Sequence, residues 1–364
     1  MKILSVVGTR PNFIKIAPLV NEMAKHPEIE QILVHTGQHY DREMSKFFFD
    51  DLGIPKPDIN LGIGSASDVA QTAKIMAEFE KVLLKEEPDL VIVVGDVNST
   101  LAAALAAAKC KIKVAHVESG LRSFDSTMPE ELNRILTDHV SDFLFTTEES
   151  GNKNLVNEGI DKGKIFFVGN VMIDSLLGHK EKSKQSKILS KLKLEKKDYA
   201  VLTLHRPSNV DNKQPLEYVL DILGEIQKKI KIVFPVHPRT LKNLDNFSLM
   251  NRIKNQKNLI ITEPLGYLDF INLMGNSKFV ITDSGGIQEE TTVLGVPCIT
   301  MRNNTERPVT VEQGTNVLVS TDKRKIAEAS NKLINGSNFK SKTPQFWDGK
   351  AAKRIIDILI KNFN

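Results

Sequence analysis

Three acidic side chains follow predicted β-strands or lie close to the start of the next predicted helix. Asp96 follows the apolar run LVIVVG, Glu118 follows VAHV, and Glu130 lies in the segment MPEELNR. Burying a carboxylate without a partner is costly, so acids in such places indicate either a function or an ion pair. Arg122 is the nearest ordinary partner for Glu118. Arg134 is the nearest one for Glu130, and with these partners the acids would be structural.

A histidine with a neighbouring cation closes a strand in the second half of the chain. His205 and Arg206 end the run Thr203–Arg206, and His205 is placed to donate a proton to a phosphate or to a leaving oxygen. A lone histidine is more often structural, but its position at the end of a strand favours a functional role. His237, in the segment VHPR, has a comparable place and is interpreted as a positioning residue.

The first predicted strand runs into a turn that suits an anion. In the segment GTRPNFIK, Gly8 permits a tight turn, Pro11 suits the first position of a helix, and the cations Arg10 and Lys15 flank the helix start. The dinucleotide fingerprint GxGxxG is absent, so a nicotinamide cofactor is not predicted. A plain strand–helix turn with two surface cations remains the alternative.

A second turn, DSGGIQEE, gives a stronger anion-binding signal. Ser284, Gly285 and Gly286 open a helix directly after an apolar strand, and their backbone N–H groups are expected to face a phosphate. Glu290 is placed to reach a ribose diol, and Arg307 adds a cation farther along the chain. The alternative is that Ser284 only caps the helix and that the glutamates are solvated.

The elements that must position these residues are short β-rich runs alternating with longer amphipathic stretches, a pattern typical of parallel sheets. We therefore predict an α/β fold with two Rossmann-like, doubly wound domains facing a central cleft. The domains are predicted at residues 1–174 and 175–347, with the last helix, 348–364, packing back on the first. The strands are predicted at residues 3–7, 32–36, 90–94, 114–117, 143–146, 165–168, 199–204, 232–236, 259–262, 279–282, 298–301 and 317–319.

Composition narrows the class of protein. With 364 residues, 41% of them hydrophobic, the chain can bury two cores. A net charge of +4, the difference between 49 basic and 45 acidic side chains, does not indicate nucleic-acid binding. No segment has the length of a signal peptide's apolar core or of a membrane span, so we expect a cytoplasmic protein. The two cysteines lack metal-ligand spacing and no His/Asp cluster is visible, so no metal is predicted.

Nine segments together resemble the family of non-hydrolysing UDP-N-acetylglucosamine 2-epimerases, which have a glycosyltransferase-B-like fold. They occur in the family's order and cover almost the whole chain. Each is weak alone, but nine in register are hard to obtain by chance. The segments are GTRPNFIKIAPLV, TGQHYDREM, VVGDVNST, HVESGLRS, PEELNR, TLHRPSN, PLGYLDF, DSGGIQEE and TERP.

The resemblance implies reversible inversion at C2 of UDP-N-acetylglucosamine. UDP leaves C1 as the C2 proton is removed, 2-acetamidoglucal stays bound, and UDP adds back after protonation of the opposite face. Asp96, Glu118 and Glu130 would be the acid/base groups, and His205 would assist the departing diphosphate. The residues implied to hold UDP are Arg10, Ser284, Gly285, Gly286 and Glu290, with Lys15 near the phosphates.

The resemblance also implies a homodimer that needs no cofactor. In many bacterial members a second substrate molecule binds at a segment corresponding to TGQHYDREM, so Gln38, His39 and Arg42 are candidate allosteric residues. Asn12 and Ser208 stand where many members have glutamate. These departures leave the finer substrate contacts open.

Other activities compatible with the same motifs remain open. A hydrolysing epimerase would release N-acetylmannosamine and UDP. An epimerase for a diacetamido uronic acid nucleotide would need a further cation near the sugar's C6. A glycosyltransferase of the same fold would not need acids on both faces of C2, and a non-enzymatic sensor of nucleotide sugars would not be expected to keep all four catalytic candidates.

Overall fold

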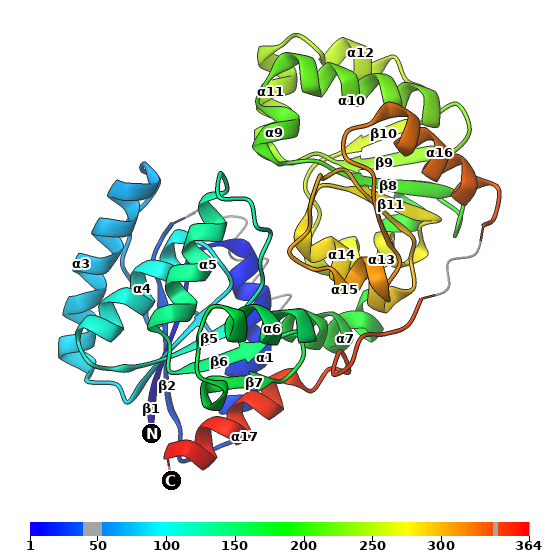
Figure 1. Ribbon diagram of the computed structural model, residues 1–364. Helices are drawn as coiled ribbons and strands as arrows, with labels where there is room; N and C mark the ends of the chain where they lie inside the picture. Colours follow the sequence, from blue (N-terminus) through cyan, green and yellow to red (C-terminus); the bar gives the residue numbers. More distant parts are fainter. Residues whose placement is uncertain (39–52, 338–340, 364) are drawn as a thin grey trace. The chain divides into compact units, whose positions relative to one another are not determined.

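The computed structural model describes residues 1–38, 53–337 and 341–363 of the chain. The chain divides into two compact units (Figure 1). The first contains Met1–Gly178 together with Gln345–Asn364, and the second contains His179–Pro344. Each unit is built on a parallel β-sheet.

The first unit has a seven-stranded sheet in the order β3-β2-β1-β4-β5-β6-β7. Every pairing in it is parallel. The central strand β4 is buried along its whole length, as expected for an apolar run covered on both faces. The strands are β1 (Lys2–Val7), β2 (Glu30–His35), β3 (Ile59–Asn60), β4 (Leu90–Val94), β5 (Lys113–Ser119), β6 (Phe143–Thr146) and β7 (Ile165–Phe167).

Helices cover this sheet according to the direction of each crossover. The chain leaves β1 toward β2 in one direction and leaves β4 toward β5 in the other, so right-handed connections place the two connecting helices on opposite faces. Helix α4 packs against α3 and α5, while α1 packs against the carboxyl-terminal helix α17. The helices are α1 (Arg10–Met23), α3 (Asp68–Glu86), α4 (Asn98–Lys109), α5 (Pro129–Val140), α6 (Glu149–Asn157), η1 (Lys162–Lys164), α7 (Val171–Ser183) and α17 (Ala351–Phe363).

The second unit has a six-stranded parallel sheet in the order β10-β9-β8-β11-β12-β13. Its strands are β8 (Tyr199–Thr203), β9 (Lys231–Pro235), β10 (Leu259–Thr262), β11 (Phe279–Thr282), β12 (Cys298–Thr300) and β13 (Asn316–Leu318). Its helices are α8 (Ile188–Lys191), α9 (Pro207–Val210), α10 (Lys213–Ile226), α11 (Pro238–Asn246), α12 (Met250–Lys254), α13 (Tyr267–Asn276), α14 (Gly285–Leu294), α15 (Val309–Glu312) and α16 (Lys323–Ile334).

The predicted α/β class with two parallel sheets is confirmed, and each predicted strand coincides with an observed one to within two residues at either end. The short edge strand β3 was not predicted because two paired residues, Ile59 and Asn60, leave no periodic signal.

The strand order reverses once in each sheet, and segments that the sequence analysis predicted to carry chemistry lie at those points. In the first unit the reversal lies between β1 and β4, which lead into the turn at Gly8 and into Asp96. In the second it lies between β8 and β11, which lead into His205 and Asp283. Ligands of doubly wound sheets bind outside the carboxyl ends of strands at such switch points.

The carboxyl-terminal segment belongs to the first unit and is fastened there by buried polar contacts. The indole of Trp347 is buried and donates from Nε1 to the carbonyl oxygen of Thr147 at 2.9 Å. The carboxylate of Asp174 accepts hydrogen bonds from the backbone N–H groups of Ala351 at 3.1 Å and Ala352 at 2.7 Å. These N–H groups are the first of α17, so Asp174 caps that helix from α7.

Replacing Asp174 with alanine is expected to lower the free energy of unfolding by about 1–3 kcal/mol, because two partly buried donors at the start of α17 lose their acceptor. Thermal unfolding at pH 5 measures the loss, because burial raises the pKa of Asp174 to about 6 and the ionised carboxylate costs folding free energy above that pH. The matched control is Asp357→Ala on the exposed side of the same helix, where an ion pair with Lys353 contributes little. Equal melting temperatures for the two variants would contradict the capping role.

Within the described part of the chain, no helix combines the length and the hydropathy required to cross a membrane.

Candidate active site

The turn after β1 is organised by Asn12, one turn into α1. Its side-chain oxygen accepts hydrogen bonds from the backbone N–H of Thr9 at 3.1 Å and from the Thr9 hydroxyl at 3.0 Å, while its amide donates to the carbonyl oxygen of Val94 at 2.9 Å. Asn12 therefore ties the end of β1 to the end of β4. The predicted phosphate ligand Arg10 is the first residue of α1 and is partly exposed.

The two charged groups Lys15 and Glu118 form a buried ion pair at these strand ends. The Nζ atom of Lys15 lies 2.7 Å from Oε2 of Glu118, and the two side chains are 7% and 1% exposed. Lys15 also fills the space beside Gly95, where a Cβ atom would lie 2.7 Å from Nζ. The suggestion that Arg122 pairs with Glu118 is wrong, because Arg122 binds Asp138 and Glu158 instead.

The backbone at Glu118 is unusual for a residue in a strand. The register of β5 against β6 shifts between Val117 and Ser119, and Glu118 has a φ of 75°, in the left-handed region. A bulge of this kind re-aims a side chain, and a non-glycine residue keeps such a conformation only when its surroundings enforce it. The strain thus coincides with a proposed acid/base group.

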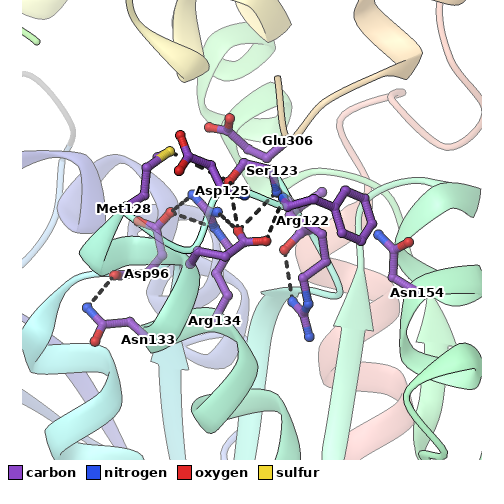
Figure 2. A network of polar contacts seen from close by, with 12 residues as sticks. Asp96, Arg122, Ser123, Asp125, Met128, Asn133, Arg134, Asn154 and Glu306 are labelled. Carbon is purple, nitrogen blue, oxygen red and sulfur yellow. Dashed lines mark hydrogen bonds and ion pairs between the residues drawn. The ribbon is translucent and has the colours of Figure 1, made fainter. Parts of the chain in front are cut away.

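Asp96, directly after the turn that follows β4, is held by Arg134 of α5. Atoms Nε and Nη2 of Arg134 lie 3.0 Å and 2.8 Å from Oδ2 of Asp96, and Asn133 donates to the Asp96 carbonyl at 2.9 Å (Figure 2). The carboxylate of Asp96 keeps 23% of its side-chain surface exposed. Arg134 therefore holds one oxygen of an acid that still reaches solvent.

The two adjacent glutamates at the start of α5, Glu130 and Glu131, have different surroundings. Glu131 is buried and accepts hydrogen bonds from the Ser123 backbone and hydroxyl, both at 3.0 Å, and from the Phe124 backbone at 2.8 Å. It also pairs with Arg134. Glu130 is exposed, and its carboxylate has no hydrogen bond or ion pair with any described residue. The suggested pair of Arg134 with Glu130 is thus wrong.

Glu131 is a residue of the candidate site that the sequence analysis did not single out. It fixes the loop between β5 and α5, in which Phe124 has a φ of 57°. The available signal was the spacing of three residues between Glu131 and Arg134, which places both on one face of a helix. Because both glutamates precede the helix interior, the sequence alone could not distinguish the anchoring acid from the solvent-facing one.

In the second unit, His205 is oriented by a buried aspartate. Nδ1 of His205 lies 3.1 Å from Oδ1 of Asp283, whose carboxylate also accepts from the backbone N–H groups of His205 and Arg206 and from Asn209. Burial favours the neutral acid, but the hydrogen bonds and charge of His205, with the bonds from Arg206 and Asn209, outweigh it and hold the pKa of Asp283 below its ordinary value. The ring of His237 lies 5.6 Å from that of His205.

Asp283 was recognised only as part of the turn DSGGIQEE, so its contact with His205 is new. The His205 side chain is 40% exposed, and its Nδ1 is committed to Asp283. A carboxylate that binds one nitrogen of a histidine fixes the ring's orientation and leaves Nε2 for a ligand.

The turn from Ser284 to Gly286 presents backbone rather than side-chain groups. Ser284 occupies the cap position of α14, but its side chain makes no capping hydrogen bond, so its interpretation as a simple helix cap is wrong. All three residues are partly exposed. The first N–H groups of α14 and the positive end of its dipole are therefore available to an anion.

Arg307, predicted to bind substrate, lies beside this turn in a buried charge network. Its Nε lies 2.7 Å from Oε1 of Glu289, it also pairs with Glu306, and Glu306 pairs with Arg302 at 2.6 Å. A Cβ atom on Gly285 would lie 2.6 Å from Nη1 of Arg307. A side chain at Gly285 would therefore displace this buried charge network. The suggestion that Glu289 is solvated is wrong because Glu289 is fully buried.

Glu290, the predicted ribose ligand, lies buried on α14 and accepts a hydrogen bond from the Tyr267 hydroxyl at 3.2 Å. Burial raises its pKa to about 7, the Tyr267 bond lowers it, and the negative charge of Glu289 raises it. The suggestion that Glu290 is a solvated side chain is therefore wrong.

The pKa of Glu290 predicts a pH-dependent stability. Between its unfolded value near 4.5 and about 7, the folded protein holds a proton that the unfolded chain releases, so stability falls as pH rises through this window. Relative to Glu290→Gln, the wild type should lose up to about 3 kcal/mol between pH 4.5 and 7. Urea unfolding across this range measures the difference, and the exposed control Glu225→Gln should follow the wild type. Parallel curves for Glu290→Gln and wild type would refute the shift.

The candidate allosteric residues are only partly described. Gln38 is buried, and its side-chain oxygen accepts from the Ser99 backbone at 3.1 Å and hydroxyl at 2.6 Å, so it ties the end of β2 to α4. His39 and Arg42 lie outside the described residues. Among the described residues, no three His, Cys, Asp or Glu side chains are grouped so that they could hold a metal ion.

Comparison with known proteins identifies the family. The model of the UDP-N-acetylglucosamine 2-epimerase family matches residues 21–360. The chain belongs to this family. It is 47% identical to the UDP-N-acetylglucosamine 2-epimerase of Methanocaldococcus jannaschii over 99% of both chains. It is 41% identical to the UDP-2,3-diacetamido-2,3-dideoxy-D-glucuronate 2-epimerase of Pseudomonas aeruginosa, over 99% of this chain and 100% of that one.

A solved structure extends the similarity to three dimensions. The crystal structure of the M. jannaschii UDP-GlcNAc 2-epimerase in complex with UDP-GlcNAc and UDP matches with a TM-score of 0.93 and 46% identity, covering 99% of this chain and 100% of that chain. This epimerase-family chain therefore has both the sequence motifs and the fold that the resemblance implied.

Proposed function

We propose that this family member reversibly converts UDP-N-acetylglucosamine to UDP-N-acetylmannosamine without releasing free sugar. The observation that carries the proposal is the set of carboxylates in the first unit. Asp96 and Glu118 lie at the carboxyl ends of the neighbouring strands β4 and β5, and Glu130 follows at the exposed start of α5. The relative solved with UDP-GlcNAc and UDP supports the choice of substrate.

The chemistry requires several acids because C2–H has no adjacent carbonyl and is weakly acidic. The C1–O bond to UDP must therefore break as the C2 proton leaves, giving 2-acetamidoglucal and UDP. Protonation of C2 on its other face, with return of UDP to C1, gives the epimer. No electrons are transferred, so the reaction needs no hydride carrier. Two faces need two positioned proton-transfer groups.

The environments in the first unit fit these roles. Glu118 is paired with Lys15, Asp96 is paired with Arg134, and Glu130 is exposed. We assign proton removal and return at C2 to this set of three. We also propose that the cation Lys15 stabilises the negative charge that develops as UDP leaves.

The second unit supplies the groups that suit the nucleotide. The N–H groups at the start of α14 suit the diphosphate, as does the positive end of its dipole. We assign Glu290 to binding of the ribose. We assign Arg10 of the first unit and Arg307 to balancing the negative charge of the diphosphate. Nε2 of His205, whose ring Asp283 orients, is assigned to the departing phosphate oxygen.

The uncharged sugar is preferred over a uronic acid because the buried cations described in the first unit already have partners. Lys15, Arg122 and Arg134 each contact a carboxylate. A substrate carboxylate at C6 would need a further cation. The hydrolysing reaction and glycosyl transfer remain outcomes of the test below. A cytoplasmic homodimer is part of the same proposal, and light scattering of the purified protein tests the dimer.

The deciding experiment is proton NMR of the purified protein with UDP-N-acetylglucosamine in D2O, without added metal or NAD. The expected result is an equilibrium mixture that contains UDP-N-acetylmannosamine deuterated at C2. Free N-acetylmannosamine with UDP would replace the proposal by the hydrolysing reaction. An unchanged spectrum, followed by turnover of the diacetamido glucuronate nucleotide, would move the substrate to that class.

A further inference from the structure

His116 of β5 is buried completely and faces hydrogen-bond acceptors on both sides of its ring. Nδ1 lies 2.6 Å from Oδ1 of Asp138 on α5, and Nε2 lies 2.8 Å from the carbonyl oxygen of Gly95. A neutral imidazole has one donor and one acceptor nitrogen, so in either tautomer one lone pair would face an acceptor oxygen. With Asp138 ionised, the geometry therefore requires hydrogens on both nitrogens.

The surroundings balance the resulting charge. Asp138 also contacts Nη2 of Arg122 at 2.7 Å, and Arg122 pairs with Glu158 at 2.7 Å. Two cations thus meet two carboxylates. Burial favours the neutral form of Asp138, but the charges and hydrogen bonds of His116 and Arg122 outweigh it and hold its pKa below the ordinary value.

The same contacts reach the backbone beside each acid proposed to act at C2. Gly95 precedes Asp96 and has a φ of 71°, and its N–H donates to the carbonyl oxygen of Val117, next to Glu118. Asp138 accepts from the N–H of Gly120 at 3.1 Å, two residues beyond Glu118. Asp138 belongs to α5, and Glu130 lies in the first turn of the same helix.

We infer that His116 is a positioning residue of the epimerase reaction, an imidazolium that fixes the backbones carrying Asp96 and Glu118 and ties them to α5. This inference rests on the proposed function. Because His116 is completely buried, it acts through the positions of these backbones and not by contact with the substrate. A misplacement of about 1 Å can cost about 10²-fold in rate.

Two near-isosteric variants separate the contacts of His116. In His116→Asn the amide nitrogen takes the place of Nδ1, which keeps the donor to Asp138 and removes the one to Gly95. In His116→Gln it takes the place of Nε2, which keeps the donor to Gly95 and removes the one to Asp138. If the contact with Gly95 positions Asp96, kcat should fall about 10–100-fold in His116→Asn and much less in His116→Gln.

If His116 has a purely structural role, a different result is expected. Both variants would then melt at lower temperature, while kcat per folded molecule and KM would stay at the wild-type values. Equal kcat values for both variants and wild type, measured well below the melting temperatures, would overturn the inference. If the wild type itself does not epimerise UDP-N-acetylglucosamine, the proposed function fails instead, and the two failures are thereby distinguished.

The protonation state has a readout that does not depend on activity. Long-range 1H–15N spectra of the 15N-histidine-labelled protein report whether each ring nitrogen carries a hydrogen, and loss of a signal in His116→Asn assigns it among the eight histidines. Both nitrogens of His116 are expected to carry hydrogens, because each one faces an acceptor oxygen. An unprotonated Nε2 at neutral pH would contradict the imidazolium.

Discussion

Replacing Glu118 with glutamine is expected to lower kcat for epimerisation by about 10²–10⁴-fold, since an amide cannot accept the C2 proton. The side chain is almost fully buried on a strained bulge and contacts Lys15 at 2.7 Å, so its geometry is fixed before substrate binds. The rate of C2 deuterium incorporation into UDP-N-acetylglucosamine in D2O measures the effect directly, because it reports proton removal even where the epimer does not accumulate.

The loss of charge also leaves Lys15 buried without its partner, which by itself destabilises the fold. The double variant Glu118→Gln/Lys15→Met removes both charges and should recover thermal stability without recovering activity. The matched control is Glu86→Gln, which breaks a similar lysine–glutamate pair with Lys2 at the start of β1. Its kcat should stay within about threefold of wild type. Near-normal deuterium incorporation by Glu118→Gln would exclude Glu118 as the base that removes the C2 proton of UDP-N-acetylglucosamine.

The second large effect is expected for Asp283→Asn, with kcat lowered by about 10²-fold or more. Asp283 orients His205 and holds the backbone N–H groups of His205 and Arg206, and asparagine replaces one accepting oxygen by a donor. Steady-state kinetics with UDP-N-acetylglucosamine, together with UDP affinity by calorimetry, separate a loss of turnover from a loss of nucleotide binding.

A double-mutant cycle tests whether Asp283 acts through His205. If it does, Asp283→Asn combined with His205→Asn should be no slower than His205→Asn alone, because effects within one unit are not additive. The control variant Asp211→Asn, which breaks a pair between the partly exposed Asp211 and Arg239, should leave kcat unchanged. Fully multiplicative losses in the double variant would show that Asp283 contributes independently of the histidine.

The strand positions and the candidate acids could be predicted because they are local properties. An apolar run such as Leu90–Val94, bounded by polar residues, predicts a buried strand without knowledge of its neighbours. A parallel sheet then places everything that follows its strands at one edge. Asp96, Glu118 and His205 were therefore expected near carboxyl ends, and the structure places them there.

The partners of these acids could not be predicted, because proximity in sequence is a poor guide across a sheet. Arg122 is four residues from Glu118, but it lies beyond the end of β5 and pairs with Asp138 of α5 and with Glu158. The observed partner, Lys15, comes from α1. In the same way Arg134 pairs with Asp96, at the end of β4, and not with the nearby Glu130.

The sequence by itself determined the class of fold, the order of the strands along the chain and the set of groups able to move protons or bind phosphate. Only the tertiary structure decided which of those groups is buried, which is free and which holds another in place. Glu131 became an anchor, Asp283 the partner of His205, and Gly285 a packing requirement. The physical reason is that burial and charge pairing depend on contacts between segments distant in sequence, which local patterns do not encode.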